Sequence, residues 1–78
     1  MEVFEISVTV GNQNQHFEIR DYMHHDETHC KYEVFKEGVF IGSFEPDQHK
    51  VLHICQNPSV VSEDVLNLIC DQLEGYHI

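Results

Sequence analysis

Basic side chains are scarce in this sequence. Its 78 residues hold only four lysines and arginines against 14 aspartates and glutamates, so the formal net charge is −10. A protein with this field repels the phosphates of nucleic acids and the anionic surfaces of membranes. We therefore expect no nucleic-acid partner and no membrane partner. The charge itself indicates solubility, or at most a cationic partner.

Long apolar runs are also missing, because the longest hold three residues, such as Val39-Phe40-Ile41. A membrane-spanning helix needs about 20 apolar residues, so none is predicted. The first residues carry acids at Glu2 and Glu5 and lack the basic start and apolar run of a signal peptide. These absences predict a cytoplasmic protein.

Cysteines are few and odd in number, at Cys30, Cys55 and Cys70. Without repeated spacing they indicate reduced thiols rather than a disulfide framework. Cys30 follows His29 directly, but neighbours in a strand point to opposite faces, which argues against a catalytic pair. The four glycines are dispersed and form no phosphate-binding loop. We predict no catalytic residue and a protein that is not an enzyme.

Helical apolar spacing occurs in one stretch, residues 62–75. Ser62 is suited to cap its first turn, and Gly75 to end it in the left-handed conformation. Leu68 lies off the apolar stripe. The stripe consists of Val65, Leu66, Ile69, Cys70, Leu73 and Tyr76. The pattern predicts a C-terminal amphipathic helix.

Apolar and polar residues alternate in five segments, which predicts five strands. Glu37-Gly38 reads as a two-residue hairpin turn. The segments are residues 2–10, 15–22, 30–36, 39–45 and 51–55. The predicted fold is α+β: a single domain over residues 1–78, with a five-stranded antiparallel β-meander followed by one C-terminal α-helix packed on one sheet face.

The turn at Glu37-Gly38 predicts the register of the hairpin around it. Phe35 is expected opposite Phe40, and Val34 opposite Ile41. One face then carries Tyr32, Val34, Val39 and Ile41, and the other carries Phe35, Phe40 and Phe44 together with the charged Lys31 and Glu33. Because of those charges, we expect the phenylalanine face to be the outer one.

The loop between the second and third predicted strands is rich in metal-binding side chains. Its histidines, acids and thiol are all competent zinc ligands. The candidate ligands are His24, His25, His29 and Cys30. A second ligand pair such as CxxC is missing, so a solvated polar loop is the alternative, and it is the one we favour. We expect no cofactor, with zinc as the open alternative.

Four apolar residues remain outside the predicted helix–sheet core: Phe35, Phe40, Phe44 and Leu68. Monomers rarely expose a large apolar patch without using it. A chain this short also buries a marginal core, which a second copy would extend. The sequence therefore predicts a non-enzymatic module that associates with itself, as a homodimer, or with another protein. The alternative is a metal-binding protein that uses the loop from His24 to Cys30.

Overall fold

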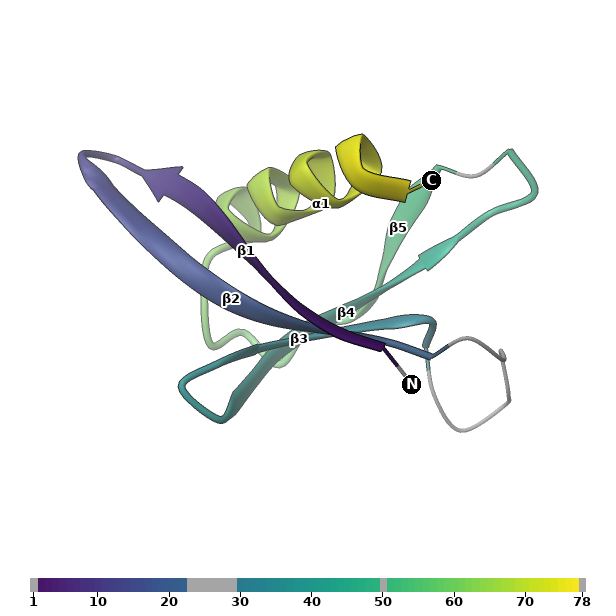
Figure 1. The fold of residues 1–78 in the computed structure, drawn as a ribbon, viewed down its shortest axis with the longest axis horizontal. Coiled ribbons are helices and arrows are strands. Elements are labelled where there is room, and N and C mark those ends of the chain that lie inside the picture. The colour runs from purple at the N-terminus through teal and green to yellow at the C-terminus, as the bar shows by residue number, and fades with distance from the viewer. Residues whose placement is uncertain (1, 23–29, 50, 78) are drawn as a thin grey trace.

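A computed structural model describes residues 2–22, 30–49 and 51–77, without the side chains of residues 76 and 77. It contains five strands and one helix (Figure 1). They are β1 (Glu2–Val10), β2 (Gln13–Asp21), β3 (Tyr32–Lys36), β4 (Val39–Pro46), β5 (Leu52–Gln56) and α1 (Glu63–His77). Each strand pairs antiparallel with the next, in the order β1-β2-β3-β4-β5. The predicted meander with its C-terminal helix is confirmed.

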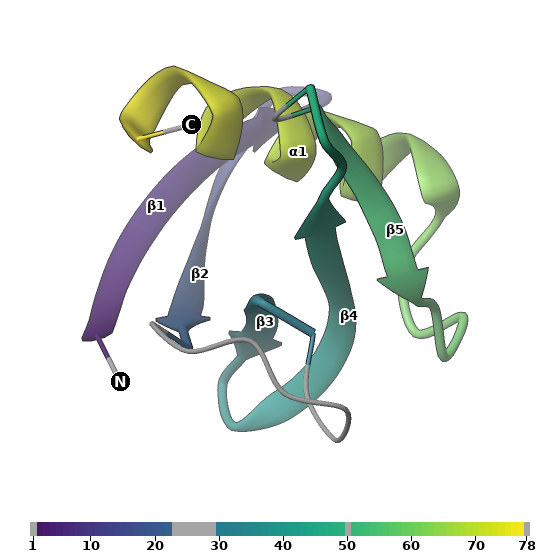
Figure 2. The same ribbon diagram turned by 90° about the vertical axis from the view of Figure 1, so that its right-hand side faces the viewer.

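The sheet curls around its inner face, and α1 crosses the open side between the two edge strands (Figure 2). The helix therefore contacts β1 and β5. Inward side chains from all five strands and the helix form one core. It comprises Ile6, Val8, Phe17, Ile19, Tyr32, Val34, Ile41, Phe44, Leu52, Leu66, Ile69 and Leu73. Within the described residues, no helix is long and apolar enough to cross a membrane.

The helix begins as its sequence predicts but ends later. The backbone N–H of Val65 donates to the Ser62 hydroxyl at 3.4 Å, which caps the first turn. Leu68 lies off the buried stripe and is 40% exposed. The prediction that Gly75 ends the helix was wrong, because α1 continues to His77 and the φ of Gly75 is not positive. Glycine takes the right-handed helical conformation as well as the left-handed one.

The β3–β4 hairpin differs from its predicted register because of a β-bulge. Glu37 and Gly38 form the turn with φ values of +51° and +82°, and Phe35 pairs with Phe40 as expected. The next pair is Val34 with Gly42, so Ile41 is an extra residue on β4. The prediction of Val34 opposite Ile41 was therefore wrong.

The bulge moves Phe44 to the other face of the sheet. Beyond Ile41 the alternation shifts by one residue, so Phe44 pairs with the inward Tyr32 and is fully buried. The prediction that Phe44 lies on the outer face was wrong for this reason. Val39, which was predicted on the inner face, is 52% exposed beside the turn.

Gly42 marks the closest approach between the sheet and the helix. A Cβ atom at this position would lie 2.9 Å from Cδ2 of the fully buried Leu66. Gly42→Ala should therefore lower the free energy of unfolding by about 1–3 kcal/mol, as overpacking of a core does. Gly75→Ala is the matched control, because nothing lies within 4 Å of its added methyl group. It should stabilise the helix by up to about 1 kcal/mol in urea unfolding. A neutral Gly42→Ala would contradict the tight helix–sheet contact.

Candidate functional site

The structure joins Cys30 and Cys55 in a disulfide, with their Cα atoms 6.4 Å apart. The prediction that all three cysteines are reduced was therefore wrong for these two. Phe44 pairs with Ile54 and Ser43 with Gln56, so Cys55 is an extra, bulged residue on β5. A bulge re-aims its side chain, and here Cys55 reaches a residue that precedes β3, beyond the intervening β4. No spacing in the sequence signals this pairing.

The disulfide also removes one of the predicted zinc ligands. A cysteine binds zinc as a thiolate, and Cys30 has no thiol while it is bonded to Cys55. Its assignment as a metal ligand is corrected accordingly. His24, His25 and His29 lie outside the described residues, so their part of the metal hypothesis stays a prediction. In the part of the chain that is described, no group of three or more His, Cys, Asp and Glu side chains is placed to hold a metal ion.

The predicted aromatic patch is smaller than expected. Phe35 and Phe40 pack edge-to-face on the outer face, with ring centroids 5.5 Å apart. The guanidinium carbon of Arg20 lies 3.9 Å from the centre of the Phe35 ring. Nε of Arg20 donates to the carboxylate of Glu18 at 2.8 Å. The two rings are half-buried by these contacts within the chain, so they do not require a partner to cover them.

Two other residues of the predicted patch lie elsewhere. Phe44 is in the core, as described above. Leu68 lies on α1, which packs on the inner face of the sheet (Figure 2). Phe35 and Phe40 lie on the outer face. The structure thus brings together only two of the four predicted residues. The patch does not form one contiguous surface.

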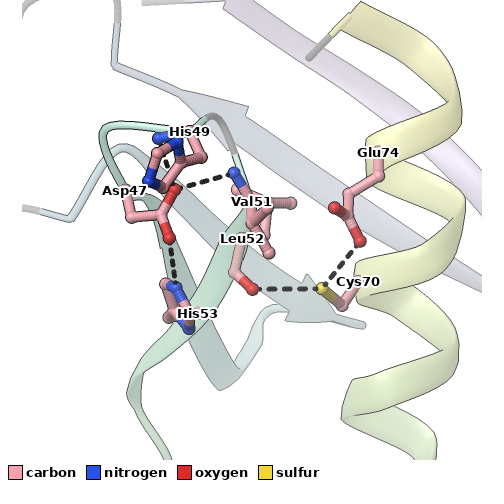
Figure 3. A network of polar contacts seen from close by, with 7 residues as sticks. All are labelled: Asp47, His49, Val51, Leu52, His53, Cys70 and Glu74. Atoms are coloured by element: carbon pink, nitrogen blue, oxygen red, sulfur yellow. Dashed lines mark hydrogen bonds and ion pairs between the residues drawn. The ribbon is translucent and has the colours of Figure 1, made fainter.

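A polar network holds the turn between β4 and β5 (Figure 3). Oδ1 of Asp47 accepts hydrogen bonds from the backbone N–H groups of His49 and Val51, at 2.8 and 3.0 Å. Oδ2 lies 2.8 Å from Nε2 of His53. The hydrogen bond from His53, followed by those from the backbone, lowers the pKa of Asp47. The network organises the turn through one carboxylate.

The stability contributed by Asp47 should depend on pH. A lowered pKa in the folded protein means stability that is present above about pH 3.9, where a free aspartate titrates, and lost as pH falls through the lowered value. Asp47→Asn should therefore be less stable than the wild type in urea at pH 7, and the difference should shrink at pH 2. Asp71→Asn, on the exposed side of α1, should change the free energy of unfolding by less than about 0.5 kcal/mol. An equal deficit of Asp47→Asn at both pH values would contradict the charged network.

Cys70 is the free cysteine, and it lies beside the same turn (Figure 3). Its Sγ lies 3.7 Å from both the carbonyl oxygen of Leu52 and Oε1 of Glu74, and these two acceptors share its single S–H. Burial, with the nearby charge of Glu74, raises the pKa of the Cys70 thiol to about 11. A thiol of this kind is protonated at neutral pH and is a poor nucleophile. Figure 3 shows the His53 ring turned toward Asp47, so it does not activate Cys70.

The surface that sequence reasoning missed is the edge of β1. Val10 and Gln13 flank the two-residue turn at Gly11-Asn12 and form its closing pair, which in such a hairpin is hydrogen-bonded. Hydrogen-bonded and non-hydrogen-bonded pairs alternate along an antiparallel ladder. The even-numbered residues of β1 therefore bond to β2, and the odd-numbered ones direct their N–H and C=O groups away from it. These are Val3, Glu5, Ser7 and Thr9, which we call the open edge of β1.

Nothing in the described ranges, 2–22, 30–49 and 51–77, forms a backbone hydrogen bond with this open edge. All four of its residues are exposed. β1 runs for nine residues without a bulge, proline or lysine, three of the features by which edge strands commonly avoid pairing. Its acids, Glu2 and Glu5, are the only charges on it. A meander always leaves its first strand at an edge of the sheet, so the edge position of β1 follows from the predicted topology.

Comparison of the chain with models of protein families, with curated proteins and with solved structures finds no match.

Proposed function

We propose that this chain is a non-enzymatic self-association module that binds a second copy of itself along the open edge of β1. The observation that carries the proposal is the length of β1, nine residues with no strand beside its open edge in the described structure. Unpaired N–H and C=O groups in a row are a template for another strand. A two-fold axis lets one such edge satisfy its own copy.

The predicted phenylalanine patch contributes less to this proposal than the edge does. Phe35 and Phe40 already contact each other and Arg20. The open edge has no such internal partner among the described residues, and main-chain hydrogen bonds would supply its affinity. Val3, 52% exposed near the start of β1, adds apolar area at the same edge.

Net charge opposes the association, since each copy carries −10. Salt screens such repulsion, with a Debye length of about 8 Å at physiological ionic strength and about 30 Å at 0.01 M. Dimers should therefore be more abundant at 0.15 M salt than at 0.01 M. A contact dominated by ion pairs would show the opposite dependence.

Ser7→Pro tests the proposal. The N–H of Ser7 faces the open edge, so proline removes an edge donor and leaves the β1–β2 ladder intact. Light scattering at physiological salt should show a wild-type mass near twice 9.1 kDa and a folded monomer for Ser7→Pro.

Two variants control this comparison. Ser7→Ala keeps the N–H and should remain dimeric. Val8→Pro removes a donor of the β1–β2 ladder and should unfold the protein. A wild-type monomer, or a Ser7→Pro dimer of unchanged affinity, would contradict the proposal.

The cytoplasmic location predicted from the sequence stays a prediction. The disulfide between Cys30 and Cys55 supports an oxidising compartment instead, because cytosolic thiols are kept reduced. We propose that the protein works where this bond persists. Trapping free thiols at cell lysis, followed by mass spectrometry, should find only Cys70 modified. Modification of all three cysteines would contradict this location.

A further inference from the structure

We infer that the two copies pair in one register, with β1 antiparallel to the β1 of the partner. The two-fold axis passes midway between Ile6 of one copy and Ile6 of the other, so that these two residues stand opposite each other. This inference rests on the proposed function, because it names how the same edge binds its copy. It follows from three features of β1: which residues face inward, which amides face the edge, and where the acids stand.

Inward side chains must stand opposite inward side chains, and this requirement excludes half of the possible registers. In a symmetric antiparallel pair, residues equally far before and after the axis stand opposite each other. An axis between two residues would place inward residues such as Ile6 and Val8, both buried, opposite outward ones such as Ser7. The axis must therefore pass through a residue.

The acids and the length of the pairing choose among the remaining registers. An axis through Glu5 would place the two Glu5 carboxylates directly opposite each other, which is destabilising. An axis through Ser7 avoids this contact but leaves Glu2 and Val3 without partners. An axis through Ile6 pairs the whole of β1.

In the Ile6 register, the side chains that stand opposite each other are also chemically compatible. Glu5 faces Ser7 of the second copy, Glu2 faces Val10, and no acid faces an acid. Val3 stands opposite Thr9, and both belong to the open edge, so this pair and the Glu5–Ser7 pair exchange hydrogen bonds. On the inner face, Phe4 stands opposite Val8 and Ile6 opposite its copy, so apolar residues face apolar residues.

Cysteine trapping tests this register. In a Cys70→Ala background, a Val3→Cys chain is mixed with a Thr9→Cys chain, and the mixture is oxidised with diamide, which takes two electrons and two protons from each thiol pair. The two thiols belong to opposite residues, whose Cα atoms are about 5.5 Å apart in a hydrogen-bonded pair, within disulfide reach. The mixture should give a cross-linked dimer on a non-reducing gel. Neither chain alone should cross-link. In this register, Val3 of one copy lies six residues along the strand from Val3 of the other, and the same holds for Thr9.

Ser7→Cys alone is the second arm, since it cross-links efficiently only if Ser7 lies on the axis. Efficient trapping by Ser7→Cys, or none from the mixture while light scattering shows a dimer, would overturn the register. The proposed function would survive that result if Ser7→Pro still dissociated the dimer. A wild-type monomer would overturn both.

Discussion

Phe44→Ala should lower the free energy of unfolding by about 3–5 kcal/mol, as large-to-small changes of buried aromatic residues do. The ring is fully buried in the core opposite Tyr32. Its removal leaves a cavity that the surrounding strands fill only in part. Urea unfolding followed by circular dichroism measures the loss.

Phe40→Ala is the matched control for this prediction. Phe40 is half-buried on the outer face, where it packs edge-to-face on Phe35. Its loss should cost about 1–2 kcal/mol, from a partly buried ring and one aromatic contact. Equal losses from the two variants, or a larger loss from Phe40→Ala, would mean that the bulge at Ile41 is absent and that Phe44 faces outward.

Removal of the disulfide should have an effect of similar size. Cys30 and Cys55 are 25 residues apart, and closing a loop of that length lowers the entropy of the unfolded chain by an amount equivalent to about 3.5 kcal/mol. The double variant Cys30→Ala, Cys55→Ala should lose about this much stability in urea. For a chain of 78 residues, this is a large share of the total.

Dithiothreitol provides the control for the disulfide. It should destabilise the wild type by nearly the same amount and leave the double variant unchanged. If native wild-type protein reacted with a thiol reagent at Cys30 and Cys55 without prior reduction, the disulfide would be contradicted. The same reaction would return Cys30 to the set of candidate metal ligands.

Local patterns in the sequence predicted most of the fold. The alternation in residues 2–10 and the turn at Glu37-Gly38 define strands whose period and turn chemistry are both local properties. The helix was predicted from the spacing of Val65, Ile69 and Leu73, which share one face whatever they pack against.

The predictions that failed depend on contacts between strands. The bulge at Ile41 arises from how β3 and β4 fit together, and Phe44 changes face because of it. The bulge at Cys55 likewise depends on the pairing of β5 with β4. Sequence spacing specifies neither, because a one-residue shift in pairing leaves the local pattern unchanged.

The edge position of β1 could have been inferred from the sequence, whereas the covering of Phe35 could not. A meander predicts that β1 has one neighbour. Which of its amides face outward depends on the turn: the predicted strands left residues 11–14 for it, whereas β2 begins at Gln13 and the turn holds only Gly11 and Asn12. Arg20 reaches Phe35 from a neighbouring strand, and only the register of β2 with β3 brings the two together.

Residue-resolved amide exchange tests edge pairing in solution most directly. In concentrated wild-type protein, the N–H groups of Glu5 and Ser7 should be protected as strongly as those of Ile6 and Val8, which bond to β2. Dilution below the dimer dissociation constant should release Glu5 and Ser7 to rapid exchange and leave Ile6 and Val8 protected. Rapid exchange of Glu5 and Ser7 at every concentration, with Ile6 and Val8 protected throughout, would show that no second copy binds the edge of β1.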